Sequence, residues 1–275
     1  MTRASDVANI LKQPFTNTLG TSNYRAGVNA GDALASGGEK NVFVGDEAGT
    51  SITTSDKNVG IGFEALKTDT LGTASVAVGH GALSTQNFTS AAQTFNVAIG
   101  FNSGTSITTG NKNTLIGNET GDALTTGNTN VALGNRALTT DTLGDHAVAI
   151  GDNALATQNF TSSTDNYNVA IGSIAGNAIT TGIYNTFVGG LAGDAQTVAD
   201  NNTAVGFEAL STNTNGSGSV AIGFRALKTQ NYGSATDSLN VAVGNASGTA
   251  VTTGTKNTLI GHATGQNQTD AGNNT

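Results

Sequence analysis

Three histidines are the side chains of this 275-residue chain best suited to acid–base or metal chemistry at neutral pH. His80 and His262 each follow a glycine of a repeated motif. If each repeat forms one coil of a stacked β-structure, with a rise of roughly 4.8 Å, these two imidazoles lie some 50 Å apart. They cannot share a metal ion at that separation. His146 has no partner in the pattern, so we expect no metal site.

Carboxylates are the other candidates for catalysis, and the pattern scatters them at turns. Glu64 and Glu208 occupy equivalent repeat positions but lie about eight coils apart, whereas a glycosidase needs two carboxyl groups within roughly 5–10 Å. The chain has no glycine-rich nucleotide-binding motif and no calcium-binding nonapeptide run. We expect neither catalysis nor a cofactor. The turn carboxylates considered are Asp46, Glu47, Glu64, Glu119, Asp152 and Glu208.

The composition is unusual for a globular enzyme. The chain has 38 Gly, one Pro, one Met and no Cys or Trp, and 11% of its residues are charged. Its short runs of Val, Ile, Ala and Leu suit a thin core shared between neighbouring strands. A net charge of −8 argues against nucleic acid and anionic membranes as partners. No apolar stretch is long enough to span a membrane, and residues 1–15 do not resemble a secretory signal peptide.

An internal repeat determines the expected fold. A motif of the type Asn-Val-Ala-Ile-Gly recurs fourteen times, mostly 17 residues apart, and every fourth spacing is 21 residues. The larger unit is therefore a 72-residue block of four coils. Numbered as coils 1 to 14, the motif glycines are Gly27, Gly45, Gly62, Gly79, Gly100, Gly117, Gly134, Gly151, Gly172, Gly189, Gly206, Gly223, Gly244 and Gly261.

Each motif has the features of a short β-strand followed by a turn. The two β-branched residues are two positions apart and share one face, and the following glycine turns the chain out of the strand. The preceding asparagine suits a turn, and stacked copies predict an asparagine ladder. We expect fourteen coils, a rod about 65 Å long, with an interior lined by Val76, Val78, Val97, Ile99, Val148, Ile150, Val169, Ile171, Val220, Ile222, Val241 and Val243.

The opposite face of the same strands is also apolar. Its middle position is mostly alanine and is larger once in each block, as at Phe43 and Phe187. Either both faces are covered within a two-layered coil, or one leaves an apolar stripe along the rod. We favour a stripe that packs against identical chains in a homotrimer. The residues expected to face the threefold axis or a neighbouring chain are Ala77, Ala98, Ala149 and Ala170.

Related inserts lengthen the three 21-residue coils. They predict three equivalent bulges near residues 86–94, 158–166 and 230–238. Their large side chains either brace the core locally or contact a host glycan or a neighbouring protein. These candidate contact or bracing residues are Phe88, Phe95, Phe160, Tyr167 and Tyr232.

The motif resembles two known families over residues 23–275. The Ser/Asn-Val-Ala-Ile-Gly repeats resemble the left-handed parallel β-roll head of trimeric autotransporter adhesins of the YadA type. The segment NTAVGFEALSTNTNG at 202–216 resembles repeats of tail fibres and virion proteins of bacteriophages, notably marine phages. Both resemblances imply extended homotrimers that bind surfaces. An autotransporter also needs a signal peptide, a stalk and a membrane anchor, so we favour a virion fibre or appendage, extracellular after release.

Two further expectations concern the ends of the chain. Residues 1–22 would form an attachment or trimerisation segment for other virion proteins, in which Ser5 could cap a short helix. The terminal Asn274-Thr275 matches the start of another motif copy, so we expect the solenoid to continue beyond residue 275.

One rival function comes from recurring Thr-Thr pairs, at 53–54, 108–109, 125–126, 139–140, 180–181 and 252–253. Regular threonine ladders on a solenoid face are a feature of some ice-binding proteins. Threonine is also simply a good exposed strand residue, and we rank this alternative below a fibre.

Overall fold

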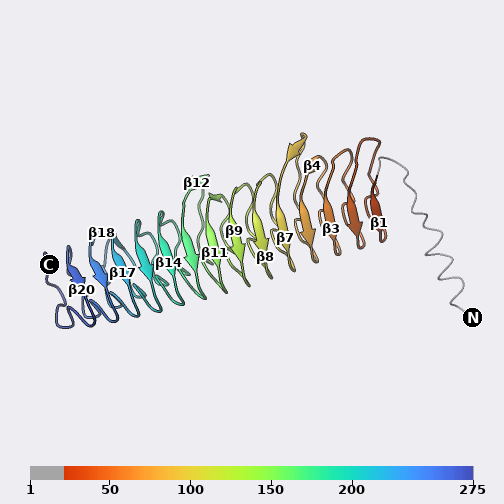
Figure 1. Cartoon of the computed structure of the whole chain (residues 1–275). Coiled ribbons are helices and arrows are strands. Elements are labelled where there is room, and N and C mark those ends of the chain that lie inside the picture. The colour runs from red at the N-terminus through yellow and green to blue at the C-terminus, as the bar shows by residue number, and fades with distance from the viewer. Residues whose placement is uncertain (1–21, 275) are drawn as a thin grey trace, which may run out of the picture.

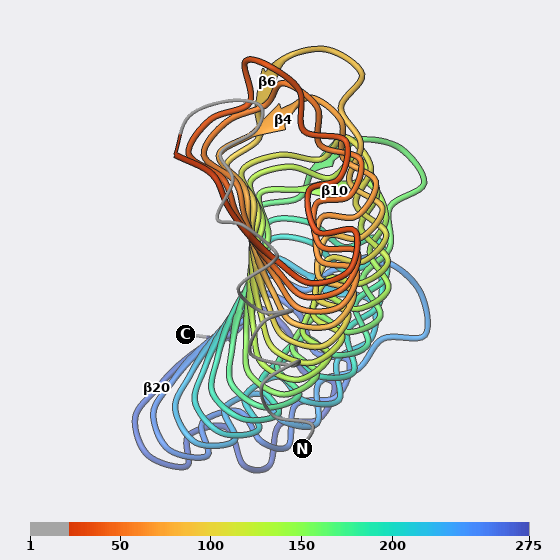
Figure 2. The same cartoon turned by 90° about the vertical axis from the view of Figure 1, so that its right-hand side faces the viewer.

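Residues 22–274 fold into a long stack of coils, as the repeat predicts. The computed structural model describes residues 22–274. Within that range there is no helix, and fourteen short parallel strands form one long sheet along the rod (Figure 1). Seen along the rod, successive coils overlap with a gradual displacement (Figure 2). The expected all-β parallel solenoid of about fourteen coils is confirmed.

The long sheet contains one three-residue strand from each coil, and neighbouring coils pair in register. Val148 of coil 8 lies beside Val131 of coil 7 and Val169 of coil 9, so residues either 17 or 21 positions apart are matched. The strands in sheet order are β1 (Tyr24–Ala26), β2 (Val42–Val44), β3 (Val59–Ile61), β5 (Val76–Val78), β7 (Val97–Ile99), β8 (Thr114–Ile116), β9 (Val131–Leu133), β11 (Val148–Ile150), β13 (Val169–Ile171), β14 (Thr186–Val188), β15 (Thr203–Val205), β17 (Val220–Ile222), β19 (Val241–Val243) and β20 (Thr258–Ile260).

Left-handed backbone conformations close each coil. In coil 6, for example, φ is +58° at Lys112, +145° at Gly117, +48° at Glu119 and +55° at Gly121. The same four places have positive φ in coil after coil. They are the residue just before the motif, the motif glycine itself, and the residues two and four positions after that glycine. Most side chains disfavour these conformations, and the stacking of neighbouring coils must hold them in place.

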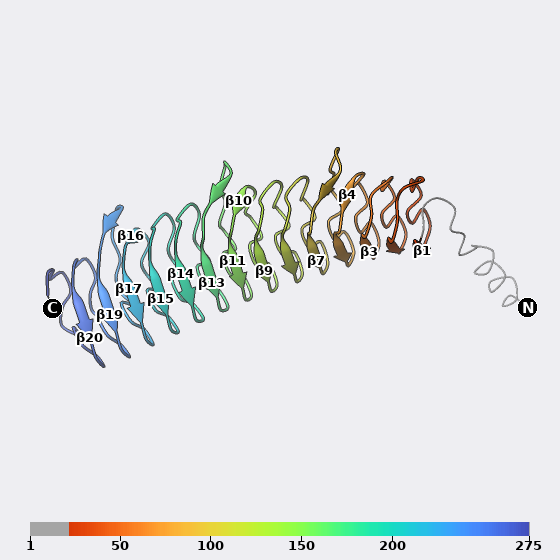
Figure 3. The same ribbon diagram turned by 45° about the horizontal axis from the view of Figure 1, so that its top comes forward.

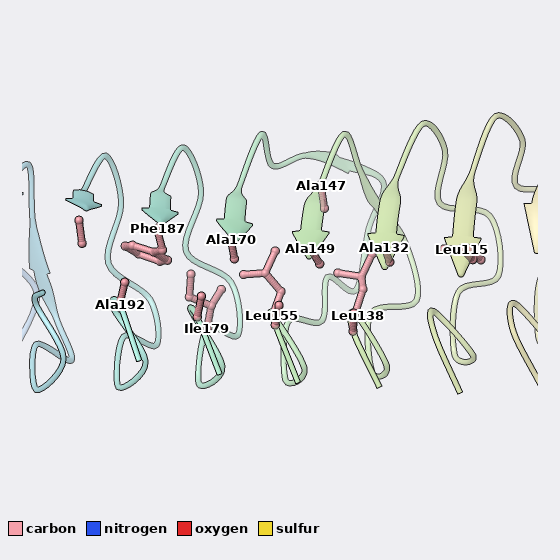
Figure 4. Close-up of a cluster of buried hydrophobic side chains, with 14 of the residues drawn as sticks. Leu115, Ala132, Leu138, Ala147, Ala149, Leu155, Ala170, Ile179, Phe187 and Ala192 are labelled. Carbon is pink, nitrogen blue, oxygen red and sulfur yellow. The ribbon is translucent and has the colours of Figure 1, made fainter. Parts of the chain in front are cut away.

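From β2 onward the middle residue of each strand, not the β-branched pair, fills the interior, whereas Arg25 of β1 is exposed. Ala77, Ala98, Ala149 and Ala170 are completely buried within the chain's own coils, and Figure 4 shows Ala149 and Ala170 pointing inward toward Leu155. The expected Val/Ile lining is therefore wrong, because the valines and isoleucines lie on the opposite face of each strand from the buried middle residue. The valines and isoleucines point outward instead.

Larger middle residues occupy the interior only where glycines make space. Phe187 is fully buried, and a Cβ added at Gly193 would lie 2.6 Å from its ring. A Cβ at Gly176, one coil earlier, would lie 2.9 Å from the same ring. Gly193 lies four residues after its motif glycine. Coils with alanine in the middle of the strand can have leucine at that position, as at Leu138 and Leu155, which are buried. The volume of the core is thus balanced across adjacent coils.

The predicted asparagine ladder is present along the inside of the rod. The Asn113 side chain accepts a hydrogen bond from the backbone N–H of Asn130 (3.0 Å) and donates one to the carbonyl of Gly127 (2.9 Å). Equivalent bonds recur at Asn58, Asn96 and Asn185. Each side chain therefore satisfies two buried backbone groups and joins one coil to the next.

The three inserts form three bulges, also as predicted, and each adds a two-stranded parallel sheet (Figure 3). Phe88, Phe160 and Tyr232 are only 8%, 5% and 5% exposed, so these rings brace the core at the base of each bulge. Phe95 and Tyr167 are exposed. The small strands are β4 (Gly72–Thr73) with β6 (Ala92–Gln93), β10 (Gly144–Asp145) with β12 (Thr164–Asp165), and β16 (Gly216–Ser217) with β18 (Thr236–Asp237).

The proposed N-terminal attachment segment, 1–22, lies almost entirely outside the described residues, and so does Ser5.

Candidate interaction surface

The outward face of the long sheet is an uncharged and largely apolar stripe, with threonine at the first position of β8, β14, β15 and β20. In every strand the first and third residues point away from the interior, and at these two positions none of the fourteen strands carries a charged side chain. Ile99, Ile171 and Ile222 are 37%, 38% and 39% exposed. Stripes of this length are uncommon on soluble monomers and mark interaction sites. We call these two columns the apolar stripe.

An uncharged stripe exists, but the residues that the sequence analysis assigned to it are wrong. Ala77, Ala98, Ala149 and Ala170 were expected to face a threefold axis or a neighbouring chain, but all four are buried inside their own coils. The sequence contains a signal that distinguishes the two faces. The middle position is mostly small, and its large apolar residues Phe43, Leu115, Phe187 and Leu259 lie beside glycines, as a thin interior requires.

Aromatic side chains stack in short ladders on the turn that follows the strands. Phe63, His80 and Phe101 lie ring over ring in coils 3 to 5, with centroids 5.2 and 5.0 Å apart. Phe207 and Phe224 form a second pair 6.0 Å apart, and the Arg225 guanidinium lies 4.8 Å from the centre of the Phe224 ring. These ladders were not anticipated, although each follows a motif glycine in the sequence.

A third ladder lies on the other side of the strands, just before them. His146, Tyr167 and Tyr184 stack with centroids 5.0 and 6.0 Å apart, and the His146 Nδ1 lies 3.1 Å from an Asp165 carboxylate oxygen. Tyr167 has a ring neighbour on each side, whereas His146 and Tyr184 have one each, and the two tyrosines are 49% and 50% exposed.

The threonine pairs have a structural role. The first threonine of several pairs donates its hydroxyl proton to a carbonyl of the next coil: Thr53 to Thr70, Thr108 to Thr125 and Thr180 to Thr197. These hydrogen bonds connect each of these coils to the next one along the rod. Ice binding by these threonines stays an alternative, which a thermal-hysteresis assay would test.

No cluster of three or more potential metal ligands occurs among residues 22–274. His80 is held between two phenylalanines, far along the rod from His262. Asp69 and Asp141 are buried, and burial raises the pKa of each carboxyl. Asp69 accepts hydrogen bonds from the backbone of Gly72 and Phe88 and from the Gln86 amide.

The third block replaces this buried carboxyl by Asn213, which accepts the same type of backbone bond from Gly216 at 3.0 Å. A neutral amide thus serves in the same place, which indicates a turn-forming role for Asp69 and Asp141 rather than catalysis.

No protein-family model matches the chain, and no significant match was found among curated proteins or solved structures. None of the described residues forms a helix long and apolar enough to cross a membrane. Function must therefore be inferred from the surface itself.

Asp194 should make the stability of the rod depend on pH. Its Oδ1 atom is buried without a hydrogen-bond partner, and burial raises the pKa of the carboxyl from 3.8 to about 6. Since the folded-state pKa is the higher one, its contribution is most favourable below pH 4 and is lost as pH rises through 6. Asp194→Ser should raise the free energy of unfolding at pH 7.5 by about 1 kcal/mol, after allowance for partial exposure, and much less at pH 4.

Urea unfolding at the two pH values measures this difference. Asp122→Ser is the matched control, because Asp122 occupies the same position in coil 6 and accepts a 2.5 Å hydrogen bond from Thr139. The control should not gain stability at pH 7.5. Equal responses of the two variants would contradict the prediction.

Proposed function

We propose that the chain is the shaft of a homotrimeric structural fibre, a virion appendage that carries attachment to a host surface. The observation that carries the proposal is the apolar stripe, which runs uncharged along all fourteen strands. Burying such a surface releases roughly 25 cal/mol per Å². Rods with one apolar stripe associate most simply around an axis parallel to the rod. The resemblance of the repeat to phage fibre repeats supplies the biological setting.

The bulges supply candidate contact points for the proposed attachment role. Their tips, residues 89–91, 161–163 and 233–235, are exposed and recur every four coils (Figure 3). Exposed loops on a rigid scaffold are the usual sites of recognition. In this proposal the tips contact a host glycan or protein, residues 1–22 join the fibre to other virion proteins, and the stripe holds the trimer together.

Mass measurement in solution tests self-association. One chain has a mass of 27.3 kDa, and the proposal expects three times that value from light scattering of the purified protein. The double variant Ile99→Lys/Ile171→Lys places two charges in the stripe without changing the interior. It should weaken association on the order of a hundredfold or more and give monomers at micromolar concentration.

Thr109→Lys/Thr181→Lys is the matched control, since both threonines are exposed on a different turn of the same two coils. This variant should remain trimeric. A wild-type protein that is monomeric, or a stripe variant that stays trimeric while folded, would overturn the proposed association. Adsorption of the purified trimer to host cells then tests the attachment role.

A further inference from the structure

The two edges of the apolar stripe carry different side chains, and they match coil by coil. We define the leading edge as the residue just before each motif and the trailing edge as the second residue after the motif glycine. In coils 1 to 14 the leading edge is Ser22, Lys40, Lys57, Ala74, Phe95, Lys112, Thr129, His146, Tyr167, Tyr184, Asn201, Gly218, Leu239 and Lys256. The trailing edge is Asn29, Glu47, Glu64, Gly81, Asn102, Glu119, Arg136, Asn153, Ile174, Leu191, Glu208, Arg225, Ala246 and Ala263.

Charge separates the two edges. The leading edge has four lysines and no carboxylate, whereas the trailing edge has four glutamates and two arginines. Three of the glutamates share a coil with a leading-edge lysine. The coil-matched pairs are Lys40 with Glu47, Lys57 with Glu64, and Lys112 with Glu119. Lys256 in coil 14 is matched with Ala263 and has no such partner.

These pairs cannot close within one chain. The five-residue motif between the two edges spans roughly 16 Å when extended. Within residues 22–274, Lys57 and Lys112 form no ion pair, and Lys40 pairs only with its neighbour Glu39 at 3.6 Å. Glu64 contacts Lys67 and Glu119 contacts Arg136, so each carboxylate already lies at the surface in a defined position.

Apolar residues show the same matching in the middle of the rod. Coils 9 and 10 carry Tyr167 and Tyr184 on the leading edge, both about half exposed, and Ile174 and Leu191 on the trailing edge. Ile174 has φ of +61°, a conformation that a β-branched residue rarely adopts. In coils 9 and 10, the two tyrosines of an aromatic ladder on the leading edge are therefore matched by two aliphatic residues on the trailing edge of the same coils.

From this pattern we infer that copies of the chain pack parallel and unstaggered, with the leading edge of one chain against the trailing edge of the next at the same coil. The inference rests on the proposed self-association and adds its geometry. An axis parallel to the rods places opposite edges together and keeps the coils level. A twofold axis perpendicular to the rods would reverse one chain and place leading edge on leading edge, so the two lysine-bearing edges would meet.

The same residues favour the unstaggered register, which gives three lysine–glutamate matches. A shift of three coils gives two, Lys112 with Glu64 and Lys256 with Glu208. A shift of one coil in either direction retains only one lysine–glutamate match, and in one of these directions it places Lys112 against Arg136. A shift by a whole four-coil block also retains only one match and places Lys57 against Arg136. Exposed ion pairs contribute little affinity but select among registers, which is the role inferred for them.

Cross-linking tests the inferred register, since the chain has no cysteine of its own. The double variant Lys57→Cys/Glu64→Cys, treated with a short bismaleimide, should give covalent dimers and trimers on a denaturing gel. The matched control is Lys57→Cys/Glu119→Cys, whose two sites lie three coils apart, roughly 14 Å along the rod. Linkage between subunits in the control should be at least tenfold lower.

The outcomes separate this inference from the proposed function. Efficient linkage in the control with none in the matched pair, or an oligomer in which neither variant links, would overturn the parallel unstaggered register while leaving self-association intact. A protein that is monomeric by light scattering before cross-linker is added would overturn both. Circular dichroism of each variant confirms that the solenoid is folded.

Discussion

Replacing Gly189 by alanine should unfold the middle of the rod. Gly189 has φ of +135°, and a Cβ built there would lie 2.6 Å from the carbonyl oxygen of Gly206 in the next coil. Backbone strain of this kind costs about 1–3 kcal/mol, and overpacking against a neighbour adds a similar amount. We expect a loss of at least about 3 kcal/mol in the free energy of unfolding, measured by chemical denaturation.

Gly233→Ala is the matched control for this prediction. Gly233 lies in the third bulge, has no positive φ, and a Cβ added there would meet nothing within 4 Å. Its variant should unfold like the wild type. Because each coil contacts only its neighbours, Gly189→Ala should also split the transition as the two halves uncouple. A single unchanged transition for Gly189→Ala would show that the coils tolerate displacement.

The period of the sequence determined most of this fold. The motif glycines placed all fourteen strands, because a residue that must turn the chain at a fixed interval defines the length of each coil. The asparagine before each strand predicted the internal ladder for a similar reason, since a buried turn amide can bond only to the coil beside it. The 21-residue spacings located the three bulges.

The orientation of the strands could not be read from the alternation alone. Both faces of Val-Ala-Ile are apolar, so the rule that apolar residues point inward does not choose between them. Size does choose: a coil of 17 residues has an interior too thin for two β-branched side chains in each strand. The Phe187 ring fits into the core because the residues beside it, at positions 176 and 193, are glycines without side chains.

The candidate surface was predictable in kind but not in detail. An apolar stripe follows from the pattern, whereas the edge columns depend on where the turns place Lys57 and Glu64 relative to the stripe. Turn geometry in each coil rests on left-handed residues, and many of them, such as Lys112 and Glu119, are neither glycine nor asparagine. Stacking on neighbouring coils imposes those conformations, which local sequence preference does not reveal.

One coil shows what the asparagine ladder requires. Ala147 stands where most coils have asparagine, and it cannot accept the backbone N–H of Asn168 in the next coil. The insert compensates, because Asn166 accepts that hydrogen bond at 2.9 Å and also donates to the Asp145 carbonyl at 2.6 Å. In this coil the lost ladder amide is therefore replaced by a side chain of the insert.

Asn113→Ala should be strongly destabilising because coil 6 has no such substitute. The change leaves the N–H of Asn130 and the carbonyl of Gly127 buried and unpaired, at about 1–3 kcal/mol for each group. We expect a loss of about 2–5 kcal/mol in the free energy of unfolding, measured by urea denaturation. Asn118→Ala, which removes an exposed amide bond to Asn135, is the control and should cost less than about 1 kcal/mol. Equal losses in the two variants would mean that the buried ladder contributes no more than a surface contact.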